Sequence, residues 1–179
     1  MMEEFYFLKH PVLMNKMKRF LLPLLAAIAL PTSVFGLGYE VKTNLMTDEK
    51  EIEFLMMATD SVKDDIGIKK DVYLFVRCEG GDPEIFVMTP TYNGENNLVG
   101  VRWNEDKPSY EYWSQSNTKT AYFVPDVKDF VKELMQRYFL TFQWEPEDSN
   151  KKVVRFALNA QDFKKELKQA QKDGCNLGL

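Results

Sequence analysis

Side chains that commonly perform chemistry are scarce in this chain. The single histidine, His10, lies in an N-terminal segment that we expect to be removed, and the two cysteines are Cys78 and Cys175. Without histidine, Ser/His/Asp catalysis is excluded and neither cysteine has the base that usually activates a thiolate. Zinc and transition metals also lose their commonest ligand. We therefore predict no catalytic residue, no metal site and no cofactor.

Carboxylates are the remaining candidates for catalysis. Glu95, Glu105 and Glu111 are the acidic residues from which a glycoside hydrolase could draw its carboxyl pair. Acidic residues are common, however, and the separation of two carboxyl groups cannot be read from a sequence. Other acidic groups, such as Asp60 and Asp64, lack the glycine-punctuated spacing of a calcium loop. We favour a non-enzymatic protein and keep a carboxylate-dependent envelope hydrolase acting on a glycan as the alternative.

Residues 14–36 have the pattern of a secretory signal peptide. A basic start around Lys18 and Arg19 precedes an apolar run over 20–30, and the small Gly36 stands before Leu37. The run is too short for a membrane-spanning helix, which needs about 20 apolar residues. We predict cleavage between Gly36 and Leu37, with residues 1–13 as an upstream extension from a mis-assigned start. An uncleaved membrane anchor is the alternative.

The remainder, residues 37–179, has the size of one domain. The full chain has 23 Lys and Arg against 27 Asp and Glu, and cleavage removes more basic than acidic residues. An acidic surface argues against nucleic acid and against adsorption to anionic lipid. We expect a periplasmic or secreted protein without stable membrane insertion. In such an oxidising compartment Cys78 and Cys175 are most simply paired in a disulfide, and two separate buried thiols are the alternative.

Short apolar runs separated by turn residues predict an α+β, mainly β, fold. We expect an antiparallel β-sandwich-like domain of seven to eight short strands, with one inserted helix and one C-terminal helix. The helices are expected after Pro125-Asp126 and from Gln161 to about Lys172, where Gly174 is a typical stop. The first strand also fits a helix, but its residues alternate. The predicted strands are 51–58, 71–78, 84–88, 98–103, 110–114, 120–124, 138–144 and 153–158.

The densest aromatic segment is the best candidate for a recognition surface. If it is a strand, Tyr110 and Tyr112 share one face while Glu111 and Trp113 take the other. Aromatic and arginine side chains dominate many protein interfaces. We favour a well-filled core for this segment, and the alternative is a possible binding surface for an envelope protein or glycan. Its residues are Arg102, Trp103, Tyr110, Tyr112 and Trp113.

The order of these landmarks resembles the VasI-like periplasmic proteins associated with type VI secretion. The resemblance rests on Cys78 at a strand end, Val101-Arg102-Trp103-Asn104, Trp113-Ser114-Gln115-Ser116, and Val154–Leu158 before a helix that ends in Cys175. It covers roughly residues 39–176 and implies a disulfide-stapled, β-rich accessory domain without established catalytic residues. We expect such a domain to bind an envelope partner. A purely structural envelope protein is a third interpretation.

Overall fold

The computed structural model describes residues 38–64, 66–146, 150–159 and 162–179. The chain divides into two compact units, residues 1–35 and 36–179, and every described residue belongs to the second. The extension 1–13, the signal peptide 14–36 and the cleavage point between Gly36 and Leu37 lie outside the described residues and stay predictions. Within the described ranges, no helix has the length and apolar character needed to cross a membrane.

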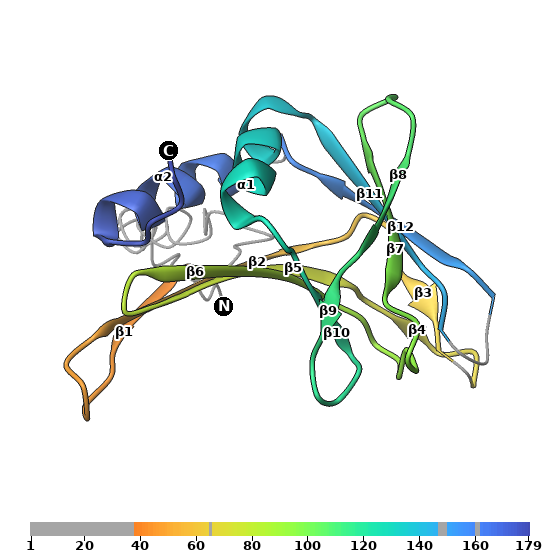
Figure 1. Ribbon diagram of the computed structural model, residues 1–179, viewed down its shortest axis with the longest axis horizontal. Helices are drawn as coiled ribbons and strands as arrows, with labels where there is room; N and C mark the ends of the chain where they lie inside the picture. The colour runs from red at the N-terminus through yellow and green to blue at the C-terminus, as the bar shows by residue number, and fades with distance from the viewer. Residues whose placement is uncertain (1–37, 65, 147–149, 160–161) are drawn as a thin grey trace, which may run out of the picture. The chain divides into compact units, whose positions relative to one another are not determined.

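Six strands form the larger of two antiparallel sheets (Figure 1). Along β2 and β5, buried apolar residues alternate with exposed or half-buried ones, so one face of the sheet joins the core. In spatial order the strands are β1 (Glu40–Thr43), β2 (Lys50–Met57), β5 (Tyr73–Glu79), β6 (Asp82–Met88), β10 (Ala121–Phe123) and β9 (Ser114–Gln115).

The smaller sheet has four antiparallel strands, and a short hairpin lies apart from both sheets. The hairpin, β3 (Val62–Lys63) with β4 (Lys69–Lys70), lies next to the smaller sheet, where the amide N of Thr59 donates to the Arg155 carbonyl oxygen at 2.7 Å. In spatial order the four strands are β12 (Lys152–Ala157), β11 (Phe139–Trp144), β7 (Leu98–Trp103) and β8 (Ser109–Tyr112).

Two helices lie on the same side of β2, β5 and β6 (Figure 1). Helix α1 (Val127–Gln136) begins where the Asp126 carboxylate accepts a hydrogen bond from the Asp129 amide at 3.0 Å, as an N-cap does. It contacts β6, and helix α2 (Phe163–Asp173) contacts β2. Each helix buries three residues at helical spacing, namely Phe130, Val131 and Leu134 in α1 and Phe163, Leu167 and Ala170 in α2.

The two sheets share one core, which confirms the predicted α+β, mainly β, fold. Tyr122 of the larger sheet meets Phe142 of the smaller sheet with ring centroids 5.8 Å apart. The described residues form twelve strands, four more than expected, because β1, β3, β4 and β9 are each four residues or shorter. The expected strand 110–114 is divided between β8 of the smaller sheet and β9 of the larger sheet, and Trp113 is the residue at the crossing.

The predicted disulfide is confirmed. Cys78 of β5 is bonded to Cys175, which follows α2, with a Cα–Cα distance of 5.7 Å across a sequence separation of 97. Gly174 ends the helix at φ 113°, a left-handed conformation that favours glycine. Beyond the bridge, the amide N of Asn176 donates to the Gly81 carbonyl oxygen at 2.9 Å. The C-terminal segment is thus fastened to the turn between β5 and β6.

Candidate functional site

The outer face of the smaller sheet collects three of the five residues of the predicted binding surface. On β7, Val99 and Val101 point into the core and are 1% and 2% exposed, so Leu98 and Arg102 take the opposite side. The register pairs Leu98 with Tyr112 across β7 and β8. We call this surface the tyrosine–arginine face, and it consists of Leu98, Arg102, Tyr110, Tyr112, Phe139 and Arg155.

The tyrosine side chains of this face are exposed to solvent, and the backbone that carries them is held in place by strand pairing. Tyr112 is 74% exposed and Tyr110 is 56% exposed. Tyr110 lies opposite Gly100 of β7, where an added Cβ atom would come within 3.2 Å of the tyrosine ring and of the Gln143 Cβ atom. The glycine therefore lets the Tyr110 ring lie down across the sheet. Two exposed phenol groups are presented on a backbone fixed by strand pairing.

Two guanidinium groups flank the middle of the face. Arg102 on β7 and Arg155 on β12 both lie opposite Thr141 of β11, so they are two strand spacings, roughly 10 Å, apart. The Arg155 guanidinium lies 5.5 Å from the centroid of the Phe139 ring. Arg102 donates from Nη2 to the Glu105 carboxylate at 2.6 Å and from Nε to the Asp106 carbonyl oxygen at 2.9 Å. The cationic groups are thereby oriented by contacts at the edge of the face.

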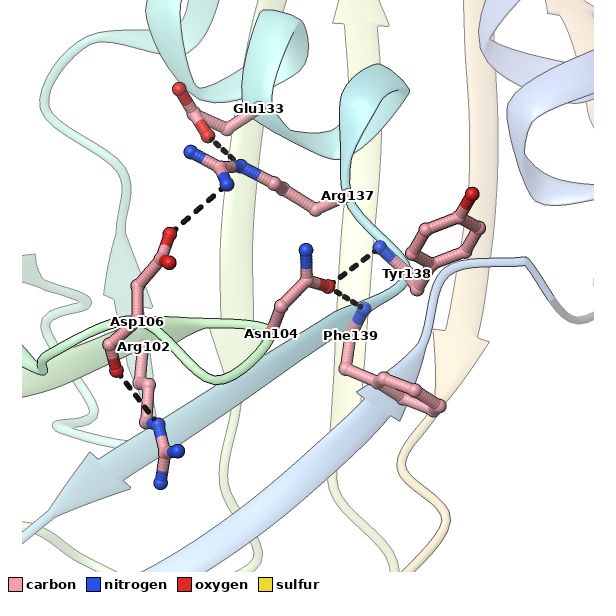
Figure 2. A network of polar contacts seen from close by, with 7 residues as sticks. All are labelled: Arg102, Asn104, Asp106, Glu133, Arg137, Tyr138 and Phe139. Atoms are coloured by element: carbon pink, nitrogen blue, oxygen red, sulfur yellow. Dashed lines mark hydrogen bonds and ion pairs between the residues drawn. The ribbon is translucent and has the colours of Figure 1, made fainter.

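A polar network holds the turn between β7 and β8 against the start of β11 (Figure 2). Asn104 has φ 48°, and its Oδ1 accepts hydrogen bonds from the amide N atoms of Tyr138 at 2.8 Å and Phe139 at 3.0 Å. The Asn104 amide in turn donates to the Phe139 carbonyl oxygen at 2.9 Å. One side chain thus satisfies two backbone donors that β11 leaves unpaired at its start.

Arg137 extends this network to helix α1 (Figure 2). Its Nη1 lies 3.0 Å from the Asp106 carboxylate and its Nε lies 2.6 Å from the Glu133 carboxylate. The hydrogen bond that Arg137 donates to the Glu133 carboxylate holds the pKa of Arg137 above its ordinary value. Because Arg102 bonds to the backbone of the same turn, the network fixes the position of Arg102 and Phe139 on the tyrosine–arginine face.

Trp113 lies in the core rather than on the possible binding surface. This side chain is 1% exposed and packs edge-on against Phe130, with ring centroids 5.6 Å apart. Its Nε1 donates to the Glu111 carboxylate at 3.1 Å. Trp113 belongs to the core because the chain passes between the two sheets at this position, so it contributes nothing to a surface.

Trp103 also points away from the tyrosine–arginine face. It is half-buried against Phe130, with ring centroids 5.0 Å apart, and lines a groove of about 360 Å³ between α1 and the β7–β8 hairpin. Glu111 and Asp129 line the same groove. Of the five residues of the possible binding surface, three therefore lie on the tyrosine–arginine face, Trp103 lies at the groove on the other side of the smaller sheet, and Trp113 lies in the core.

The predicted carboxylate candidates are not brought together. Glu95 pairs with Lys119 at 2.9 Å and Glu105 pairs with Arg102 at 2.6 Å, so only Glu111 reaches the groove beside Trp103. Glu111 is exposed and accepts hydrogen bonds from Trp113 and Ser109. Among the described residues no three His, Cys, Asp or Glu side chains are grouped so as to hold a metal ion.

Sequence reasoning missed Leu98, Phe139 and Arg155 as members of the face. Their outward direction follows from the alternation within β7, β11 and β12, but which side of these strands faces solvent depends on the packing of the second sheet. Asn104 was noticed only as part of a motif. Its partners at Tyr138 and Phe139 are 34 and 35 positions away, and no local pattern marks them.

The chain matches no protein-family model and no curated protein. Among solved structures it is similar to the crystal structure of invasion associated protein B from Bartonella henselae, at 12% identity and a TM-score of 0.48. The similarity covers 77% of this chain and 95% of that chain. A similarity of this degree carries no inference about function, so the site stands on its own geometry.

Proposed function

We propose that this chain is an exported, non-enzymatic accessory domain of the bacterial envelope that binds a partner through its tyrosine–arginine face. The partner is an envelope protein or a glycan. In line with the resemblance to VasI-like proteins, a component associated with type VI secretion is the protein that we would test first.

The observation that carries the proposal is the combination of exposed Tyr110 and Tyr112 with two arginines on a rigid sheet. Tyrosine and arginine are enriched where protein interfaces gain their binding energy. Tyrosine also loses little conformational entropy on binding because it has only two side-chain torsions. A polar network fixes the nearby turn, so the face loses little further freedom when it binds.

The disulfide supports export. Disulfides form and persist in oxidising compartments and are rare in the cytosol. The Cys78–Cys175 bridge is buried, with both cysteines at most 1% exposed, which suits a permanent structural bond. We therefore assign the protein to the periplasm or the exterior, with the segment 14–36 as the export signal.

The groove beside Trp103 is where the hydrolase alternative would have to act. It contains aromatic walls and carboxylates, but Asp129 is paired with Lys132 at 2.6 Å and Glu133 with Arg137. A glycosidase needs one carboxyl group whose pKa is raised so that it can donate a proton. Glu111, the remaining candidate, is exposed and hydrogen-bonded to two donors. These contacts favour the binding role.

The test compares variants of the exported protein, purified from the periplasm after expression of the full chain. Two candidate partners are tested separately: the candidate secretion component and isolated cell-wall glycan. Tyr112→Ala combined with Arg155→Ala should weaken binding about tenfold or more, equivalent to a loss of at least about 1.4 kcal/mol. Tyr92→Ala is the matched control, because Tyr92 is as exposed as Tyr110, at 56%, and lies off the face.

Equal binding by the double variant and the control would overturn the proposed face. Release of reducing ends from cell-wall glycan by the wild-type protein, abolished by Glu111→Gln, would instead establish the hydrolase. Recovery of the protein from the cytosol with both thiols free would contradict export.

A further inference from the structure

The outer face of the larger sheet carries an apolar band on the side opposite the helices. Leu55, Phe75, Phe86 and Phe123 lie directly opposite one another on β2, β5, β6 and β10. A second row beside it contains Met57, Tyr73 and Met88. We call these seven residues the aromatic band. In the part of the chain that the structure describes, both helices and the smaller sheet pack on the opposite face of this sheet (Figure 1).

The rings of the band stand on edge. Phe75 and Phe86 are stacked with centroids 5.1 Å apart and planes 4° apart, and Phe86 and Phe123 are also 5.1 Å apart. That spacing is close to the distance between neighbouring strands, about 4.8 Å. Two parallel rings at this separation must lie face to face, because coplanar rings would collide. The ring faces therefore cover one another: Phe86 at the centre is only 9% exposed, Phe75 and Phe123 beside it are half-buried, and Met88 is 36% exposed. The exposed part of the band consists of ring edges and aliphatic groups, which suits aliphatic side chains better than a sugar ring laid flat.

Acidic residues occupy the adjoining half of the same sheet face. The next row across the sheet is Glu53, Arg77 and Glu84, and the row after it is Glu51, Glu79 and Asp82. The surface there is hollowed into a pocket of about 380 Å³ that Glu79 and Asp82 line.

Most of this negative charge is uncompensated. Arg77 forms an ion pair with Glu84 and lies 5.6 Å from the centroid of the Phe86 ring. Among the described residues, Glu51, Glu53, Glu79 and Asp82 form no ion pair. Lys42 of β1 lies opposite Glu51 and forms its own ion pair with Glu40 at 2.8 Å. The face thus divides into an apolar half and a half with a net negative charge, with Arg77 at the boundary.

We propose that this face is a second docking surface, which takes an amphipathic, basic segment of another protein. The apolar side of that segment would cover the aromatic band and its lysines or arginines would lie over the acidic rows. Charge complementarity selects this occupant. A neutral glycan leaves the carboxylates unused, an anionic membrane is repelled, and a second copy placed face to face brings the same acidic half. The proposal is independent of the tyrosine–arginine face.

The probe is an amphipathic helical peptide of roughly 18 residues, five turns, built from leucine and lysine. It is titrated into the isotope-labelled protein, and the backbone amide shifts are followed by NMR. We expect the shifts to map to β2, β5, β6 and β10. A peptide of the same composition with its leucines scattered around the helix should bind at least tenfold more weakly, and a leucine–glutamate peptide should not bind.

Variants separate the two halves of the surface. The double variant Glu53→Gln with Glu79→Gln should lower the affinity for the peptide about tenfold and reduce the salt dependence of binding. Leu55→Gln should also lower the affinity for the peptide. Val153→Gln, at a 50% exposed position of β12 in the smaller sheet, is the control and should bind normally. The charge variants remove no buried group, so loss of folding does not confound them.

Four results would overturn the proposal: shifts confined to the smaller sheet or to the Trp103 groove, unchanged affinity in the double charge variant, self-association of the protein in sedimentation, or co-sedimentation with anionic vesicles. Self-association would make a second copy the occupant, and vesicle binding would make it a membrane.

Discussion

The two sheets of this domain are joined to their helices by different chemistry. The larger sheet is bonded covalently to the end of α2 through Cys78–Cys175, where both cysteines are at most 1% exposed. In the smaller sheet, Asp106 of the β7–β8 turn forms an ion pair with Arg137 at the end of α1, and the side-chain Oδ1 atom of Asn104 binds the backbone of the segment that follows α1 and starts β11. One junction is buried and covalent, while the other is polar and in contact with water.

The difference indicates how each junction responds to its surroundings. A buried disulfide is insensitive to salt and to moderate changes of pH but is broken by a reductant. A surface ion pair is screened by salt, whereas backbone hydrogen bonds to a side-chain amide are not charged and resist screening. Each sheet should therefore be loosened by a treatment that leaves the other unchanged.

Removing Trp113 should have the largest effect, because this side chain lies between the two sheets and serves both. Trp113→Ala is expected to lower the free energy of unfolding by about 3–5 kcal/mol, through lost burial and the cavity that remains. Denaturant unfolding followed by circular dichroism measures the change. Tyr92→Ala, on the surface, should change it by less than about 0.5 kcal/mol. A Trp113→Ala loss as small as that of the control would remove Trp113 from the core.

Breaking the bridge should affect the larger sheet first. Cys78→Ala with Cys175→Ala is expected to lower the free energy of unfolding by about 2–4 kcal/mol, since a loop of this length gives about 4.7 kcal/mol in the chain-entropy treatment and measured values run lower. Hydrogen exchange should accelerate in α2 and β5 while the amides of β7 and β8 stay protected. Equal acceleration in both sheets would show that the two junctions are one cooperative unit.

Asn104→Ala tests the polar junction. It removes the acceptor of two backbone amides and places alanine at φ 48°, so we expect a loss of about 1–3 kcal/mol. Asn104→Asp keeps an acceptor oxygen and should recover most of the loss, and Asn104→Gly relieves only the backbone cost. Hydrogen exchange at Tyr138 and Phe139 reports the effect directly. Full protection of these two amides in Asn104→Ala would contradict the assigned role.

Glu166 should make the stability of the α2 region slightly dependent on pH. Its Oε2 atom is buried without a hydrogen-bond partner among the described residues, and burial, with Asp162 nearby, raises the pKa of this carboxyl to about 6. A raised carboxyl pKa means that the ionised form is disfavoured in the folded state. Stability is therefore highest below the ordinary pKa of 4.5 and declines as pH rises through about 6.

Glu166→Gln should remove that decline and stabilise the protein at neutral pH by no more than about 1 kcal/mol, because the side chain is partly exposed and screened by solvent. Melting temperatures from pH 4 to pH 8, about one unit apart, measure the effect. A wild-type protein that becomes more stable as pH rises from 4.5 to 6 would show that the sign is wrong.

The longer strands and helices could be predicted from the sequence, because an element with one buried face repeats apolar residues at a regular spacing. The eight expected strands correspond to the strands that contribute most of the core, and the cap at Asp126 and the stop at Gly174 mark the helices that follow. The missing strands are two to four residues long. A pattern of period two needs more residues than that to be distinguished from chance.

The candidate site was harder to predict because it depends on which side of the smaller sheet faces solvent. Alternation placed Tyr110 and Tyr112 on one side and Trp113 on the other, as the structure has them. It could not show that the tyrosines are outside, nor that Trp103 faces the groove at α1. That information comes from the second sheet and the helix, which are distant in the sequence.

The position of the two cysteines also sets the order in which the protein can be completed. Polypeptides are made and translocated from the N-terminus, so Cys78 waits as a thiol while 97 further positions are delivered. All the strands after β5 and both helices lie in that interval. With two cysteines in the chain there is a single intramolecular pairing, so no isomerase is required to correct it. The disulfide therefore forms last, after the strands between the two cysteines have paired in their native register.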